Sequence, residues 1–124
     1  MKLSSEKKLN NEQLEAVKHK RGPLLIIAGA GTGKTTVVTE RIKYLILSKL
    51  AKPEEILALT FTEKAAREMQ ERVDIAMPYG YTNMWISTFH SFCDRVLRTE
   101  ALHIGLNPRF KLISEATAPQ LIRK

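Results

Sequence analysis

The feature that most constrains the fold is an apolar run that passes through a glycine-rich turn into a long stretch without proline or glycine. The run covers residues 24–28, the turn residues 28–35 and the stretch residues 34–50. The run is apolar on both faces, which is typical of a strand in the interior of a parallel sheet. Apolar residues then recur at helical spacing along the stretch. The sequence therefore predicts a buried strand, a tight turn and a helix, in that order.

The same alternation of strand and helix occurs twice more along the chain. An apolar run at residues 56–61 precedes a helical pattern at 63–76, and a run at 84–88 precedes a helical pattern at 90–101. Strands that alternate with helices form parallel sheets, whose ligands bind at the carboxyl ends of the strands. We therefore expect an α/β fold, with a parallel sheet flanked by helices and a short helix before it at about residues 9–20.

The glycine-rich turn has the composition of a phosphate-binding Walker A loop. Glycines adopt positive φ and lack Cβ, so successive backbone N–H groups can turn inward around a phosphate chain. Lys34 would place its ammonium on the β and γ phosphates, and Thr35 would offer its hydroxyl to Mg²⁺. The strict pattern begins with Gly, where this loop has Ala28. The predicted nucleotide-binding residues of the loop are Ala28, Gly29, Ala30, Gly31, Thr32, Gly33, Lys34, Thr35 and Thr36.

The charge balance of the chain favours a polyanionic partner. The sequence has 20 Lys and Arg against 13 Asp and Glu, a net charge of +7, and an excess of this kind suits nucleic acid. The one cysteine, Cys93, has no second cysteine with which to form a disulfide, which favours a reducing compartment such as the cytoplasm. Its helical neighbours predict that it is buried. No apolar run approaches the roughly 20 residues that span a bilayer, and residues 1–8 are predicted to be a solvated lead-in.

Three segments around these strands resemble the N-terminal, ATP-binding part of superfamily 1 DNA helicases of the UvrD/Rep/PcrA type. They are residues 9–17, which resemble the Q motif of that family, residues 60–69, which resemble its motif Ia, and residues 88–91, which resemble its motif Ib. The resemblance implies a P-loop NTPase fold of the RecA-like kind, with ATP and Mg²⁺ as cofactors. It also implies that Gln13 recognises adenine, and a side-chain amide does offer a donor and an acceptor that match the N7 and N6 groups of that base.

The resemblance implies that the ends of the second and third strands contact single-stranded DNA. Hydroxyl groups suit the DNA backbone and aromatic rings suit the bases, which stack regardless of sequence. The family usually has Asn at the position of Glu63, and a carboxylate there repels phosphate. Without the resemblance, Phe61 and Phe89 are ordinary core residues and His90 is a helix cap. The implied DNA contacts are Thr60, Phe61, Thr62, Thr88, Phe89, His90 and Ser91.

Other parts that such a motor needs do not occur in this sequence. Transfer of phosphate requires a Walker B carboxylate pair and arginines from a second RecA-like domain. The run at residues 110–113 looks like a further strand, but Ser114 stands where a metal-binding Asp would be needed. We therefore expect residues 9–124 to be the N-terminal part of the first RecA-like domain, ending near the start of an inserted helical subdomain.

The sequence thus predicts the ATP-binding portion of an ATP-dependent 3′ to 5′ DNA helicase, in which Lys34 and Thr35 are the catalytic residues. Its partner would be single-stranded DNA, or a duplex with a single-stranded tail, and the chain by itself would be inactive. Two alternatives stay open: a P-loop kinase of a small molecule, for which the loop alone would serve, and a non-catalytic fragment that binds nucleotide or DNA. Stimulation of ATP hydrolysis by single-stranded DNA distinguishes the helicase from the kinase. The oligomeric state is left open.

Overall fold

A computed structural model of the 124-residue chain describes residues 9–31, 33–77, 84–113 and 118–119. The chain divides into two compact units, Met1–Thr88 and Phe89–Lys124. Each unit has its own internal contacts.

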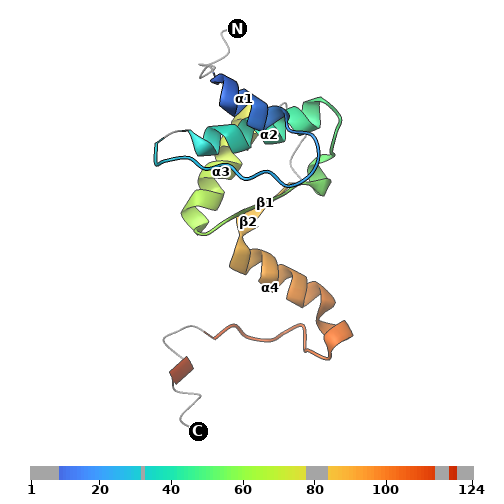
Figure 1. The fold of residues 1–124 in the computed structure, drawn as a ribbon. Helices are drawn as coiled ribbons and strands as arrows, with labels where there is room; N and C mark the ends of the chain where they lie inside the picture. Colours follow the sequence, from blue (N-terminus) through green and yellow to red (C-terminus); the bar gives the residue numbers. More distant parts are fainter. Residues whose placement is uncertain (1–8, 32, 78–83, 114–117, 120–124) are drawn as a thin grey trace. The chain divides into compact units, whose positions relative to one another are not determined.

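The first unit is an α/β unit built around two parallel strands (Figure 1). Its elements, in chain order, are α1 (Asn11–Lys18), α2 (Lys34–Leu47), the 3₁₀ turn η1 (Pro53–Glu55), β1 (Leu57–Thr60), α3 (Glu63–Ala76) and β2 (Trp85–Thr88). β1 and β2 pair in parallel, from Leu57 opposite Trp85 to Thr60 opposite Thr88. The predicted α/β class and parallel pairing are therefore correct, in a sheet of two strands among the described residues.

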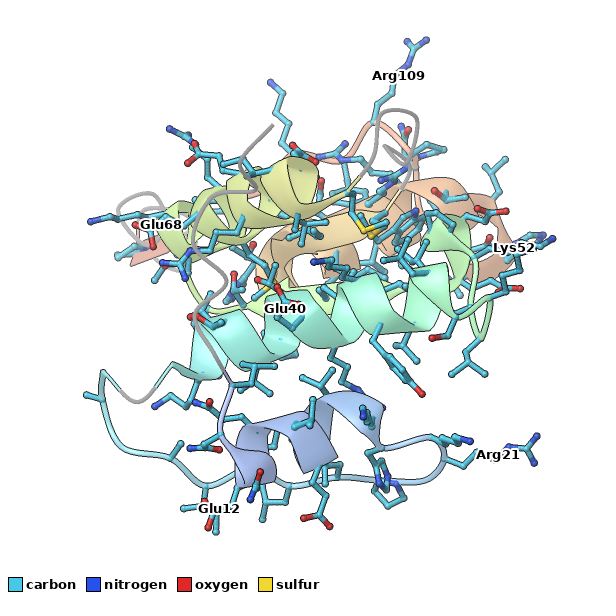
Figure 2. All side chains as sticks on the ribbon, turned by 90° about the horizontal axis from the view of Figure 1, so that it is seen from above. Glu12, Arg21, Glu40, Lys52, Glu68 and Arg109 are labelled. Atoms are coloured by element: carbon cyan, nitrogen blue, oxygen red, sulfur yellow. The ribbon has the colours of Figure 1, made fainter. Side chains whose placement is uncertain are left out.

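The core of this unit lies where α2 and α3 meet the strands. Its buried residues come from α2, from α3, and from the positions just after α3 and just before β2: Ile42, Ile46, Val73, Met77 and Met84. Partly buried apolar side chains of both strands pack against them. Figure 2 shows α2 between α1 on one side and α3 on the other, in agreement with the contacts between these helices. Two faces of α2 are therefore covered, one by α1 and one by α3, and α3 in turn contacts both strands.

α1 begins with a capping box. The Asn10 side chain accepts a hydrogen bond from the backbone N–H of Gln13 at 2.8 Å, and the Gln13 side chain accepts one from the backbone N–H of Asn10 at 3.0 Å. These bonds satisfy two N–H groups that a helix start leaves without partners. Ala16 and Val17 are buried against Val37 of α2, which fixes the face that α1 turns toward α2.

α2 ends at Leu47, three residues before the end predicted from composition. The backbone N–H of Leu50 donates to the carbonyl of Leu45 at 2.9 Å, and that of Lys49 donates to Ile46 at 2.9 Å. This pair of bonds is the Schellman motif, which needs a left-handed residue between them. Lys49 takes that conformation, with φ 55°, although glycine is the usual residue there. The helix therefore stops through its own hydrogen bonds before it reaches Pro53.

The predicted strand at residues 24–28 does not form in this structure. These residues are neither helix nor strand, and their exposed fractions alternate, from 43% at Leu24 and 41% at Ile26 to 82% at Leu25 and 89% at Ile27. Exposure that alternates from residue to residue is typical of an extended chain whose side chains are partly covered on one side only. A strand also needs neighbours with which to share hydrogen bonds, and in the described sheet β1 and β2 pair with each other. The prediction of a buried strand here was wrong for this structure.

The second unit consists of α4 (Phe89–Glu100), the 3₁₀ turn η2 (Ala101–Ile104) and the segment that follows. Ala101 is fully buried, and Gly105 ends η2 in the left-handed conformation. Arg98 donates to both carboxylate oxygens of Asp94, at 3.1 and 2.9 Å, and its guanidinium lies 4.5 Å from the ring centre of Phe110.

Two predictions fail in the second unit. Residues 110–113 form no strand, and Arg98 instead donates at 3.3 Å to the carbonyl oxygens of Pro108 and Phe110. The sequence predicted that Cys93 is buried, but it is exposed. The reason is that α4 has no buried residue within the described part of this unit. In the described residues, no helix is long and apolar enough to cross a membrane.

Candidate nucleotide and DNA site

The glycine-rich turn opens α2 in the way the sequence predicts. Gly31 has φ 75° and Gly33 has φ 86°, and Gly33 is the residue that precedes the first helical residue. Residues with a side chain rarely adopt these backbone angles, so glycine is favoured at both positions. Gly33 makes no side-chain cap, so the first N–H groups of α2 point out of the helix without a capping side chain. Thr32 lies outside the described residues.

The ammonium group of Lys34 lies over the turn. Its Nζ donates to the carbonyl oxygen of Ala28 at 2.9 Å and to that of Gly29 at 3.3 Å. The side chain therefore folds back across the loop instead of extending into solvent. This arrangement places a fixed positive charge beside the N-terminus of α2, which carries the positive end of the helix dipole. Both features favour an anion at this end of the helix.

Gln13 lies against the same turn although it belongs to α1. A Cβ built on Gly33 would come within 3.3 Å of the Gln13 Nε2 atom. That distance is tight for a carbon contact, so the amide of Gln13 and the backbone of Gly33 are direct neighbours. The oxygen of the same amide accepts the Asn10 N–H, which holds the side chain in place. The structure therefore brings together the residue that the family resemblance links to adenine and the turn predicted to bind phosphate.

Thr35 and Thr36 occupy the first turn of α2, and both are partly exposed. The carbonyl oxygen of Thr35 accepts a hydrogen bond from the buried hydroxyl of Thr39 at 2.9 Å. This bond involves the backbone of Thr35 and not its hydroxyl. The role of that hydroxyl toward Mg²⁺ stays a prediction. Within the described residues, no three His, Cys, Asp or Glu side chains are grouped to hold a metal ion.

A second cluster of predicted residues lies at the carboxyl ends of the strands. Thr60 is opposite Thr88 in the parallel register. The Thr60 hydroxyl donates to the carbonyl oxygen of Thr62 at 3.1 Å, and the Thr62 hydroxyl accepts from the N–H of Ala65 at 3.1 Å. The Thr62 side chain therefore caps α3. Between these threonines, Phe61 is 88% exposed, which removes it from the core of the first unit.

Glu63 and Thr88 are joined directly. The Thr88 hydroxyl donates to Oε1 of Glu63 at 3.0 Å, and Thr88 is 3% exposed. Sequence reasoning treated Glu63 as a charge that opposes phosphate and missed this bond. The only signal in the sequence was a hydroxyl residue at the end of one strand and an acceptor just after the end of the other.

The remaining predicted DNA contacts belong to the second unit. Phe89, His90 and Ser91 form the first turn of α4, and all three are exposed, Phe89 by 44%. The interpretation of Phe89 as a core residue is therefore not supported within this unit. His90 is the second residue of α4. A capping residue precedes the helix, so His90 is not its N-cap.

The fold and these two clusters define an α/β protein whose glycine-rich loop opens a helix and whose parallel strands end in polar residues. Residues 9–124 match the family described as the UvrD/REP helicase N-terminal domain, and the chain belongs to that family. It is 51% identical over 115 residues to the ATP-dependent DNA helicase PcrA of Bacillus subtilis (strain 168) and 50% identical over 115 residues to that of Staphylococcus aureus (strain Mu50). Each match covers 93% of this chain and 16% of the relative.

Proposed function

We propose that the chain is the ATP-binding portion of an ATP-dependent DNA helicase that moves 3′ to 5′ along single-stranded DNA. The observation that carries the proposal is the position of Lys34, whose ammonium lies over a turn with two left-handed glycines at the start of α2. Membership of the helicase family supports the same assignment. In this proposal residues 9–124 belong to a P-loop domain of the RecA-like kind, in a cytoplasmic protein.

The residues at the turn fit a nucleotide with its phosphates. Lys34 would exchange the carbonyl oxygens of Ala28 and Gly29 for phosphate oxygens, which are stronger acceptors because they are charged. The N–H groups at the start of α2 would donate to the same phosphates. Gln13 would bind adenine, and the Thr35 hydroxyl would help to hold Mg²⁺. When bound, Mg²⁺ would supply positive charge that offsets the negative charge of the phosphates.

The strand ends fit a nucleic acid strand. Phe61 offers an exposed ring on which a base can stack, and the flanking threonines offer polar groups. Phe89, His90 and Ser91 would add contacts from the start of α4. The proposed substrate is single-stranded DNA, or a duplex with a single-stranded tail. We expect the 124-residue chain by itself to hydrolyse ATP negligibly, because its sequence supplies neither Walker B carboxylates nor the arginines of a second domain.

The test uses the full-length protein with Lys34→Ala. Developing charge on the transferred phosphate would lose its nearest fixed cation, so ATP hydrolysis stimulated by single-stranded DNA should fall nearly to zero. Lys43→Ala is the matched control, because Lys43 is a cation of the same helix whose ion-pair partner, Glu40, also belongs to α2. Activity of Lys34→Ala within a few-fold of the control would show that the turn is not the phosphate site. ATP hydrolysis that DNA does not stimulate would instead favour the small-molecule kinase.

A further inference from the structure

A single guanidinium nitrogen ties α2 to the far end of α1. Nη1 of Arg41, on α2, donates to the carbonyl oxygens of Ala16 at 2.9 Å, Val17 at 3.3 Å and His19 at 2.7 Å. The first two carbonyls lie in the last turn of α1, and His19 is its C-cap. Arg41 is partly buried at this contact.

These three carbonyls need a donor from elsewhere in the chain. The last carbonyl groups of a helix have no N–H partner within it, and they carry the negative end of the helix dipole, where a cation is stabilising. α1 has only 8 residues, fewer than the roughly 12 to 15 that a helix needs to persist alone in water. Its place in the fold therefore depends on α2, through Arg41 and through the contact of Ala16 and Val17 with Val37.

Arg41 and Gln13 act at opposite ends of the same short helix. Gln13 lies in the first turn of α1, with its amide against Gly33. Arg41 holds the last turn and lies about two helical turns beyond Lys34 on α2. The turn that would bind phosphate therefore leads directly into α2, and α2 carries the side chain that holds the end of α1. A shift of α1 along α2 would move the Gln13 amide relative to the turn.

We propose that Arg41 is a positioning residue for recognition of the nucleotide base. By fixing α1 on α2, Arg41 sets the distance between the Gln13 amide and the phosphate turn, so that the preference for adenine depends on a side chain that itself contacts no nucleotide. The inference rests on the proposed function, in which Gln13 binds adenine and the turn binds phosphate.

The test measures kcat and KM for ATP and for GTP in the full-length protein with single-stranded DNA. Arg41→Met keeps an unbranched apolar side chain and removes every donor. The preference for ATP over GTP in kcat/KM should fall by about tenfold, within the range found for residues that act through a neighbour. The loss should lie in KM for ATP, with kcat at saturating ATP nearly unchanged.

A purely structural role would give a different result. Loss of folded protein lowers the activity with both nucleotides by the same factor, so it leaves their ratio unchanged. Lys43→Met is the control, since it removes a cation from the same helix whose ion pair with Glu40 at 3.7 Å does not involve α1. Its ratio should equal that of the unaltered protein. If Arg41→Met does not fold, Arg41→Gln retains an amide donor and should lower the ratio by a smaller factor.

Combining Arg41→Met with Gln13→Ala separates the positioning role of Arg41 from the adenine-binding role of Gln13. Gln13→Ala should lower the ATP to GTP ratio, and Arg41→Met should lower it no further when Gln13 is already absent. If Gln13→Ala lowers the ratio and the Arg41 variants do not, the positioning role is wrong and the proposed function stands. An equal loss from Arg41→Met in both backgrounds would also overturn it. If Gln13→Ala leaves the ratio unchanged, the adenine-binding role of Gln13 in the proposed function is wrong.

Discussion

The hydroxyl of Thr88 donates a hydrogen bond to the carboxylate of Glu63 at 3.0 Å, and this bond links the end of β2 to the first residue of α3. Thr88 is the last residue of its strand and is almost fully buried, so its hydroxyl is held in one place. A carboxylate at a helix start is also favoured by the helix dipole. Glu63 is therefore part of the structure of the strand ends as well as a charge beside them.

We expect Thr88→Val and Glu63→Ala to have coupled effects on stability. Each removes the same hydrogen bond, whose net contribution should be about 1 kcal/mol. The double variant should therefore be less destabilised than the sum of the single variants by about that amount. Hydrogen exchange of the N–H groups at the start of α3, such as those of Ala65 and Ala66, measures this locally in the full-length protein. Additive effects would show that the bond contributes nothing.

Glu63→Gln should tighten the binding of single-stranded DNA. The substitution keeps the shape and an acceptor for Thr88 but removes a negative charge beside the proposed DNA contacts. Exposed charge interactions contribute up to about 1 kcal/mol, so affinity at low salt should rise about two- to fivefold, and the gain should fade at high salt. Glu68→Gln, an exposed position on the same helix (Figure 2), makes the same change in net charge. Equal gains from both variants would mean that the charge at Glu63 has no local role.

Phe61→Ala should weaken the binding of single-stranded DNA by about 1 to 3 kcal/mol, the usual contribution of one stacked base. Fold stability should barely change, because the ring is 88% exposed. A stacking contact releases no counterions, so the dependence of affinity on salt should keep its slope. Loss of a phosphate contact would instead reduce that slope by about 0.7.

Ile75→Ala is the control for Phe61, because Ile75 is an exposed apolar residue of α3, 80% accessible, outside the proposed DNA contacts. It should leave DNA affinity unchanged. A destabilisation of about 3 to 5 kcal/mol by Phe61→Ala, the amount typical of a buried aromatic residue, with unaltered affinity of the folded molecules, would contradict the stacking role.

In the full-length protein, the side chain of Ile27 should be protected from solvent. The run at residues 24–28 is apolar on both faces, and such runs are covered on both faces in parallel sheets. In a background without other cysteines, Ile27→Cys should react with a thiol reagent at least about tenfold more slowly than Ile75→Cys, since burial limits access to local opening. Equal rates would show that this run is not a strand of the proposed P-loop sheet.

Local sequence was sufficient for the elements whose ends and faces are set by neighbouring residues. α3 begins at Glu63 and ends at Ala76 as predicted, because Thr62 caps it and its apolar residues repeat at helical spacing. The left-handed glycines at 31 and 33 could likewise be inferred, since a tight turn around phosphate before a helix requires them, whereas Gly29, for which the same was expected, does not take positive φ. The end of α2 was placed too late, because Lys49 adopts a glycine-like conformation that composition does not reveal.

The sequence by itself determined the helices, the two strands that pair, the glycine-rich turn and the residue types at the strand ends, since these depend on contacts between near neighbours in the chain. Only the tertiary structure decided that Gln13 lies against Gly33, that Arg41 binds the end of α1 and that Thr88 binds Glu63. It also left residues 24–28 outside the sheet. Each of these outcomes depends on which distant segment comes close enough to supply a donor, an acceptor or a neighbouring strand, and periodicity within a single segment does not carry that information.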